Sequence, residues 1–139
     1  MTKKFFQVPT LDVAKYWNSF EPVLNKAILR GADNTLTIEG CFQRLVNNFW
    51  QLFIVIDNDE LELAFVTQVI PSDVCNSLCV VYIASYEGKE ADLEYLQTCL
   101  EQVAKNYNCK KIMGGGRKAW RRKLKTLGYK EIVFMEKEL

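Results

Sequence analysis

Residues 77–129 constrain the fold most, because they alternate between the patterns of buried strands and amphipathic helices. The run 78–84 is rich in β-branched and aromatic residues and is bounded by turn formers, which predicts a buried strand. Residues 90–107 carry leucine and valine at helical spacing, and residues 110–113 predict a second short strand. Two short strands joined by a helix favour a parallel pair with a right-handed crossover.

The loop that enters the helix at 90–107 is the first candidate for ligand binding. In a parallel strand–helix–strand unit this loop faces the amino terminus of the helix, where unpaired backbone N–H groups attract anions such as phosphate. If the protein binds a phosphorylated ligand, we expect it there first. The alternative is an ordinary strand-to-helix loop capped by acids. The loop residues are Tyr86, Glu87, Gly88, Lys89, Glu90 and Ala91.

The other segments predict an α+β fold. Pro22 lies inside the first helical pattern, so a kink or restart is expected there. The acidic turn 57–59 joins two strands into an antiparallel hairpin, in which Leu61, Leu63 and Phe65 share a face. From the amino terminus, the predicted elements are helices at 11–29 and 37–48, strands at 50–56 and 60–69, the strand–helix–strand unit, a basic helix at 117–127 and a final strand at 130–137.

Composition narrows the class of protein. The length of 139 residues and the 49% hydrophobic content predict one globular domain, 1–139. The formal net charge of +1, from 18 basic and 17 acidic residues, argues against a dedicated nucleic-acid-binding protein. The chain has no histidine, which excludes a Ser-His or Cys-His triad.

The five cysteines predict reduced thiols rather than disulfides. Their number is odd and most lie in or beside apolar segments, as in a cytosolic protein. Cys75 and Cys79 have no matching second pair, so no metal site is expected. The sequence has neither a signal peptide nor a run long enough to span a bilayer, so we expect a cytoplasmic location without membrane contact.

The predicted order of elements resembles the GNAT acyltransferase superfamily over nearly the whole chain. The pair Gly128-Tyr129 after the basic helix is similar to the Gly-aromatic pair of that superfamily. Trp17 and the segments 49–70 and 114–131 resemble small GNAT-like proteins encoded by tailed phages. The resemblance implies a mixed, mostly antiparallel sheet with one parallel strand–helix–strand crossover and helices on both faces.

The resemblance also implies a site for acetyl-CoA. The loop 86–91 would hold the pyrophosphate with its backbone amides, and the splayed parallel strands would take the pantetheine arm. Arg117, at the start of the basic helix, is a further cofactor-binding candidate, in place of an asparagine frequent in the family. The loop departs from the family pattern because Gly88 is its only glycine and because Glu87 and Glu90 would repel phosphate.

The resemblance does not supply a complete set of catalytic residues. Many members carry a tyrosine four residues before the Gly-aromatic pair, as the acid that protonates the leaving thiolate, and here that position is Leu124. A general base would be a carboxylate such as Glu62, or a water held by backbone.

Two hypotheses therefore stay open. In the first, a phage-encoded GNAT-fold protein binds acetyl-CoA and transfers an acetyl group to an amine. In the second, the fold has lost catalysis and serves as a virion-associated or host-directed protein-binding module, with the basic segment 117–125 gripping an acidic partner. That segment also fits an ordinary solvated helix face. A homodimer is possible through an exposed final strand.

Overall fold

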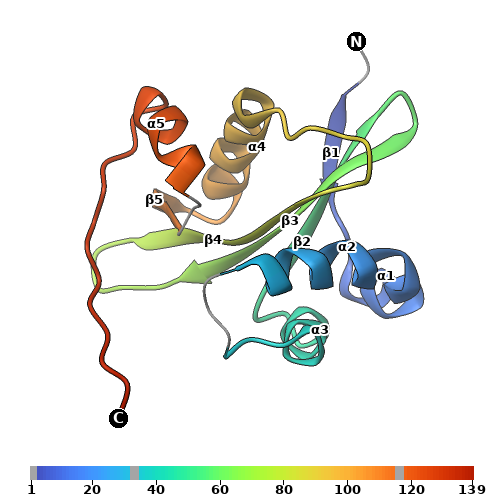
Figure 1. Ribbon diagram of the computed structural model, residues 1–139, viewed down its shortest axis with the longest axis horizontal. Coiled ribbons are helices and arrows are strands. Elements are labelled where there is room, and N and C mark those ends of the chain that lie inside the picture. The colour runs from blue at the N-terminus through green and yellow to red at the C-terminus, as the bar shows by residue number, and fades with distance from the viewer. Residues whose placement is uncertain (1–2, 32–34, 115–117) are drawn as a thin grey trace.

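A computed structural model describes residues 3–31, 35–114 and 118–139. Its centre is a five-stranded sheet in the order β1-β2-β3-β4-β5, covered on both faces by helices (Figure 1). The strands are β1 (Lys4–Gln7), β2 (Gln51–Asp57), β3 (Glu60–Ile70), β4 (Asn76–Ser85) and β5 (Cys109–Gly114). The helices are α1 (Thr10–Lys15), α2 (Trp17–Arg30), α3 (Ile38–Val46), α4 (Leu93–Asn106) and α5 (Lys118–Thr126).

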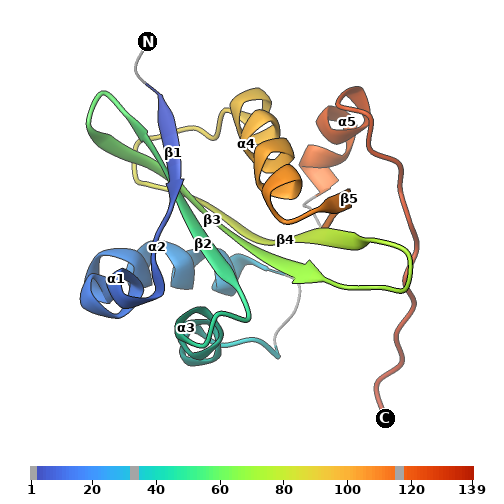
Figure 2. The same cartoon turned by 180° about the vertical axis from the view of Figure 1, so that it is seen from behind.

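The sheet has the predicted mixed topology. Strands β1 to β4 pair antiparallel with their neighbours, and β4 pairs parallel with β5 through the crossover helix α4. Helices α1, α2 and α3 cover one face, and α4 and α5 cover the other (Figures 1 and 2). The α+β prediction with one parallel crossover is therefore confirmed. None of the helices among the described residues is long and apolar enough to cross a membrane.

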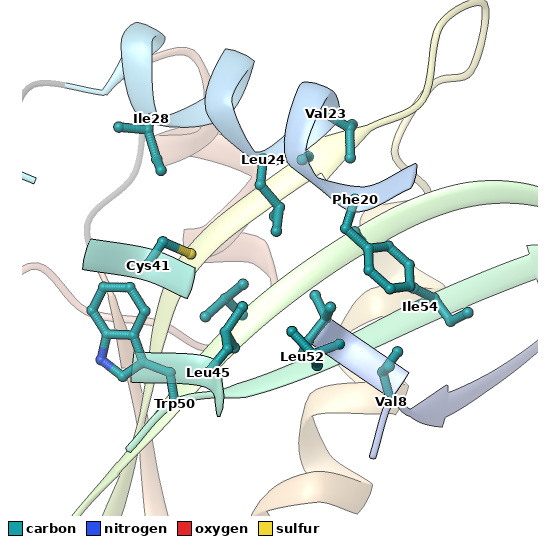
Figure 3. Close-up of a cluster of buried hydrophobic side chains, with 14 residues drawn as sticks. Val8, Phe20, Val23, Leu24, Ile28, Cys41, Leu45, Trp50, Leu52 and Ile54 are labelled. Carbon is teal, nitrogen blue, oxygen red and sulfur yellow. The ribbon is translucent and has the colours of Figure 1, made fainter. Parts of the chain in front are cut away.

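The face under α1, α2 and α3 holds one compact apolar cluster. Figure 3 shows Phe20 and Leu24 pointing from α2 toward the strands, with Cys41 and Leu45 of α3 beside them. Leu24 and Cys41 are 0% exposed. Burial raises the pKa of the Cys41 thiol to about 12, so this cysteine stays a neutral apolar side chain at physiological pH.

The face under α4 holds a second cluster. The rings of Phe53 and Phe65 stack there with centroids 5.0 Å apart, against Leu96 and Cys99 of α4. Burial raises the pKa of the Cys99 thiol to about 11, as expected for a cysteine that acts as a small hydrophobe. The amphipathic pattern of α4 thus packs its apolar face on the sheet as its spacing predicts.

The β2–β3 hairpin forms at the predicted turn, but it contains a bulge. Asn58 and Asp59 have φ of 53° and 65°, the left-handed pair that a tight two-residue hairpin turn requires. The strand register skips Glu62, and this bulge turns Leu61 to the opposite face from Leu63. The prediction that Leu61 shares the face of Leu63 is therefore wrong.

The first helical segment is divided at a different place from the one predicted. The break falls at Tyr16, which has φ −110° and ψ 21°, and α2 continues through Pro22. The structure also adds a strand that the sequence reading missed, because β1 pairs antiparallel with β2 from Lys4 to Gln7.

The predicted final strand at 130–137 does not form. This segment has no ladder partner among the described residues, and its side chains are exposed. Alternation alone does not make a strand, because backbone hydrogen bonds to a neighbouring strand are needed as well. Gly115, Gly116 and Arg117 lie outside the described residues.

Candidate binding cleft between β4 and β5

The parallel strands β4 and β5 part at the middle of β4. Their pairing runs from Asn76 with Cys109 to Val80 with Gly114, and β4 then continues alone on this side to Ser85. In open sheets with parallel strands, ligands bind in the crevice at the carboxyl ends of those strands. The parting of β4 and β5 is such a place.

Two local features produce this parting. The register between β3 and β4 skips Val81, and such a bulge bends and twists the strand that carries it. On the other side, β5 approaches β4 closely at Gly114, where an added Cβ would lie 2.9 Å from the carbonyl oxygen of Val80. A glycine is therefore required at the last paired position, immediately before the strands diverge.

An apolar pocket of about 60 Å³ lies beside the parting, between the sheet and helices α4 and α5. Leu124 is one of its half-buried lining residues. The full lining is Val80, Ile83, Leu93, Leu96, Gln97, Leu100, Ile112, Met113, Gly114, Leu124, Leu127 and Tyr129.

Tyr129 is the one lining residue with an ionisable side chain among those described. Its hydroxyl donates a hydrogen bond to Oε1 of Gln97 at 2.6 Å, which fixes the ring against α4. Burial raises the pKa of the Tyr129 phenol, so the phenol stays protonated at neutral pH. The sequence reading used Tyr129 only as part of the Gly-aromatic pair and missed its place in the pocket. The signal for it was an aromatic hydroxyl directly after the predicted helix.

The predicted phosphate loop lies between β4 and α4. Gly88 has φ +77°, and nothing lies within 4 Å of the position where a Cβ would be, so the loop is open there. Tyr86 turns inward against the first cluster, and burial raises its pKa. Ala91 packs against the second cluster. The exposed part of the loop is therefore limited to residues 87–90.

An acidic side chain already caps the amino terminus of α4. Asp92 accepts a hydrogen bond from the backbone N–H of Tyr95 at 3.1 Å, and Lys3 Nζ lies 3.0 Å from its Oδ2. The Tyr95 N–H and then Lys3 hold the pKa of Asp92 below its usual range. The cap uses a backbone donor of the kind that a bound phosphate would need.

Glu62, the candidate base, lies at this end of α4 and does not line the apolar pocket. Its Oε1 is 3.1 Å from Lys3 Nζ, and its side chain is 12% exposed. The structure thus brings Glu62 together with Lys3 and Asp92.

Lys89, the one basic residue of the loop, pairs with Glu60 at 2.7 Å on the surface. The hydrogen bond raises the pKa of Lys89 and lowers that of Glu60. Exposed pairs of this kind are weak, so an anion of higher charge would compete for the lysine.

The described part of the basic helix also makes local ion pairs. Lys125 and Arg121 contact Oε1 of Glu131 at 3.0 and 3.4 Å, and Lys123 contacts Glu94 at 3.1 Å. Arg117, the predicted cofactor residue at its start, lies outside the described residues.

Among the described residues, no group of three or more Cys, Asp or Glu side chains is placed to hold a metal ion.

Comparison with known proteins identifies the fold. No family model matches the sequence, and no curated protein matches it. Among solved structures, a possible acetyltransferase from Clostridium difficile 630 superposes with a TM-score of 0.74 at 9% identity, over 100% of this chain and 97% of that one. A predicted acetyltransferase from Clostridium acetobutylicum, solved with acetyl-CoA, gives 0.69 at 14% identity, over 99% and 96%.

A third similar structure is the aminoglycoside acetyltransferase meta-AAC0020 from an uncultured soil metagenomic sample, solved with sisomicin. It gives a TM-score of 0.69 at 11% identity, over 99% of this chain and 96% of that one. These likenesses cover both chains almost completely, so this protein has the fold of the GNAT acetyltransferases.

Proposed function

We propose that this protein binds acetyl-CoA in the cleft where β4 and β5 part. The observation that carries the proposal is the apolar pocket beside that parting, at the carboxyl ends of two parallel strands. The likeness to an acetyltransferase solved with acetyl-CoA supports the same ligand. When bound, acetyl-CoA would supply an activated thioester, and the acceptor would be an amine.

The residues present fit this ligand in two respects. The apolar side chains between β4, β5 and α4 would contact the methylene and methyl groups of an extended pantetheine arm, and the backbone of β4 beyond Val80, which β5 does not pair, would offer partners to its two amides. Gly88 leaves open space at the start of α4, and Lys89 would exchange the exposed Glu60 for a phosphate. Glu87, Glu90 and Asp92 oppose an anion there, so we expect weaker binding than a basic loop would give.

Tyr129 would hold the proton that a leaving thiolate needs. Its hydroxyl lies in the pocket wall and stays protonated at neutral pH, whereas Leu124 has no proton to give. Glu62 remains the predicted general base. Its ion pair with Lys3 makes it a weaker candidate for that role than a water molecule held by backbone groups.

Ligand-dependent stability tests the binding proposal. We expect acetyl-CoA to raise the unfolding temperature by several degrees, since a ligand at a hundred times its Kd adds about 2.7 kcal/mol. Gly88→Asp places a negative charge in the open space beside the helix, and Gly88→Asn is its neutral control of the same shape. Aspartate and asparagine tolerate a left-handed φ better than other non-glycine residues do. Gly88→Asp should abolish the shift, and Gly88→Asn should keep most of it.

Equal shifts in Gly88→Asp and the unchanged protein would show that the loop does not hold the phosphates. Unphosphorylated pantetheine provides a second comparison, because it enters the apolar cleft without using the loop. A shift with pantetheine and none with acetyl-CoA would place the failure in the loop alone.

Thiol release from acetyl-CoA with a panel of amines, aminoglycosides included, tests transfer. Tyr129→Phe removes the hydroxyl and its bond to Gln97 while keeping the ring in the pocket wall. We expect kcat to fall by about 10²-fold, the range of one acid–base group, with little change in acetyl-CoA affinity. An unchanged kcat would remove Tyr129 from the reaction.

The acid-capped helix favours a second candidate function. Asp92 and the pairs of Lys3 and Lys89 satisfy the loop without a ligand, as in a GNAT fold that has lost catalysis and binds a protein. No stabilisation by acetyl-CoA, CoA or pantetheine would favour this candidate. The search would then turn to acidic partners of the basic helix α5.

A further inference from the structure

The five cysteines fall into two groups by their exposure. All five are free thiols. Cys41 and Cys99 are buried in the two apolar clusters and are 0% and 1% exposed. Cys75, Cys79 and Cys109 are only partly buried. Because an oxidant must reach a thiol before it can react, only the second group is open to redox chemistry.

Two of the partly buried cysteines lie side by side where β4 and β5 begin. Asn76, the first residue of β4, is the ladder partner of Cys109, the first residue of β5. Cys75 immediately precedes Asn76 in the chain. Neighbouring strands lie about 4.8 Å apart and rise about 3.3 Å per residue, so Cα atoms one position out of register are roughly 6 Å apart. Disulfides bridge Cα atoms at about 4.4 to 6.8 Å, so the backbones of Cys75 and Cys109 are within reach of a bond.

Side-chain contacts place the two thiols near each other as well. The thiol of Cys109 donates a weak hydrogen bond to the carbonyl oxygen of Tyr107 at 3.8 Å, and Nδ2 of Asn76 donates to the same oxygen at 3.1 Å. The Cys109 thiol therefore lies beside the residue that follows Cys75. Burial raises the pKa of Cys109, and the nearby Cys75 thiol raises it further, which requires the two sulfur atoms to be close.

Cys75 lies in a turn, whereas Cys79 lies inside a strand. The carbonyl oxygen of Cys75 accepts a hydrogen bond from the backbone N–H of Ser72 at 3.1 Å, in the turn between β3 and β4. Its side chain is therefore not tied to the alternating faces of β4. Cys79, by contrast, has Gln68 and Met113 as its neighbours in the ladder. Of the three partly buried cysteines, Cys75 and Cys109 thus form the pair that can react together.

We propose that Cys75 and Cys109 form a reversible disulfide when the protein meets a small-molecule disulfide, for which glutathione disulfide is the probe. The thiolate of Cys75 attacks one sulfur of the probe and releases one glutathione. The thiolate of Cys109 then attacks the Cys75 sulfur of this mixed disulfide and releases the second glutathione. Two protein thiols lose two electrons and two protons, and one glutathione disulfide gains them to become two glutathione molecules. This inference is independent of the proposed acetyl-CoA site.

The bond would close a ring around the whole strand–helix–strand unit. Strand β4, the loop 86–91 and helix α4 all lie between the two cysteines in the chain. A cross-link over a loop of this length removes conformational freedom from the unfolded chain, so the oxidised protein should be the more stable form. The bond would join β4 and β5 at the end where they pair, and it would leave their parting beyond Val80 unchanged.

Thiol counting in glutathione buffers of increasing oxidising strength tests the inference on the full-length protein. We expect the free thiols of the folded protein to fall from five to three. Peptide mapping without reduction should recover Cys75 linked to Cys109. The oxidised protein should unfold at a temperature about 5 °C or more above that of the reduced protein, and a reductant should reverse this shift.

Serine variants assign the bond to its two sulfur atoms. Cys75→Ser and Cys109→Ser should each abolish the rise in unfolding temperature. Cys79→Ser removes the third partly buried thiol and is the matched control, so it should keep the rise. If Cys109→Ser does not fold, the comparison of Cys75→Ser with Cys79→Ser decides alone.

Several results would overturn the inference. One is a protein that keeps five free thiols in the most oxidising buffer. Another is a reaction that stops at the mixed disulfide of Cys75 with glutathione, because the two sulfur atoms would then be too far apart to exchange. A bond that includes Cys79, or one that joins two molecules in place of the internal link, would overturn it as well.

Discussion

The two faces of the sheet are built from similar residues, but they are closed to different degrees. Under α1, α2 and α3 the side chains of Val13, Leu24 and Leu45 are at most 1% exposed. Under α5, by contrast, no described side chain of the helix is fully buried, and Leu124 and Leu127 line a pocket. The comparison teaches that this fold can close one face of the sheet completely and leave open only the part of the other face under α5, because the part under α4 is closed as well.

One bulge and one glycine border the open part. The bulge at Val81 lies on β4, and Gly114 marks the last close contact before β5 ends. A bulge twists its strand and interrupts a ladder, so packing cannot continue evenly beyond it.

Truncating one leucine on each face gives the largest effect and the most direct test of this comparison. Leu24→Ala should lower the free energy of unfolding by about 3 kcal/mol, because it leaves a cavity in a closed cluster. Leu124→Ala should cost about 1 kcal/mol or less, because the half-buried side chain already borders open space. Denaturant unfolding measures both, and equal losses would contradict the comparison.

Adding a methyl group to one glycine on each face should give effects of opposite sign. Gly114→Ala would set its Cβ 2.9 Å from the carbonyl oxygen of Val80, so β4 and β5 must separate at a cost of about 2 kcal/mol. Gly40→Ala in α3 meets mainly the end of the flexible Arg44 side chain, and helix propensity should offset this contact. Thermal unfolding of the two variants checks the sign, and a Gly40→Ala variant that is destabilised as much as Gly114→Ala would contradict the comparison.

The smallest expected effect concerns the acidic cap on the open face. Asp92→Ala should cost about 1 kcal/mol at neutral pH, the value of a lost helix cap. Because the folded state lowers the pKa of Asp92, the unfolded state binds more protons in acid, and stability falls as the pH drops below about 4. Acid unfolding of the wild type and the variant should therefore converge at low pH. A constant gap down to about pH 2 would mean that the charge of Asp92 is not what stabilises the helix.

Local sequence patterns predicted the part of the fold where each pattern determines its own structure. The hairpin turn at Asn58 and Asp59 and the helix α4 follow from short-range signals, and so does the parallel pair that α4 joins. The strand β1 was missed because its four residues, Lys4–Gln7, are too few to show a period without their partner β2. The final strand was predicted from alternation alone, and the structure gives it no neighbour among the residues it describes.

The candidate site was less predictable than the fold. The loop with Gly88 stands where the sequence placed it, but the cap by Asp92 and its link to Lys3 join residues that lie far apart in the chain. Tyr129 enters the pocket because α5 ends beside Gln97, a contact that no spacing rule contains. Such tertiary contacts depend on how the helices pack, and single-sequence patterns carry little information about that.

The ion pair between Lys3 and Asp92 has a consequence for biosynthesis. The two residues are 89 positions apart, and β1 itself must wait for β2 before it can pair. On the ribosome, β1 would therefore be synthesised well before the elements that hold it in place, and it would be late to find its position, since contacts this distant in sequence form slowly. During that interval Phe5, which packs against the second cluster in the folded protein, would stay exposed and available to chaperones.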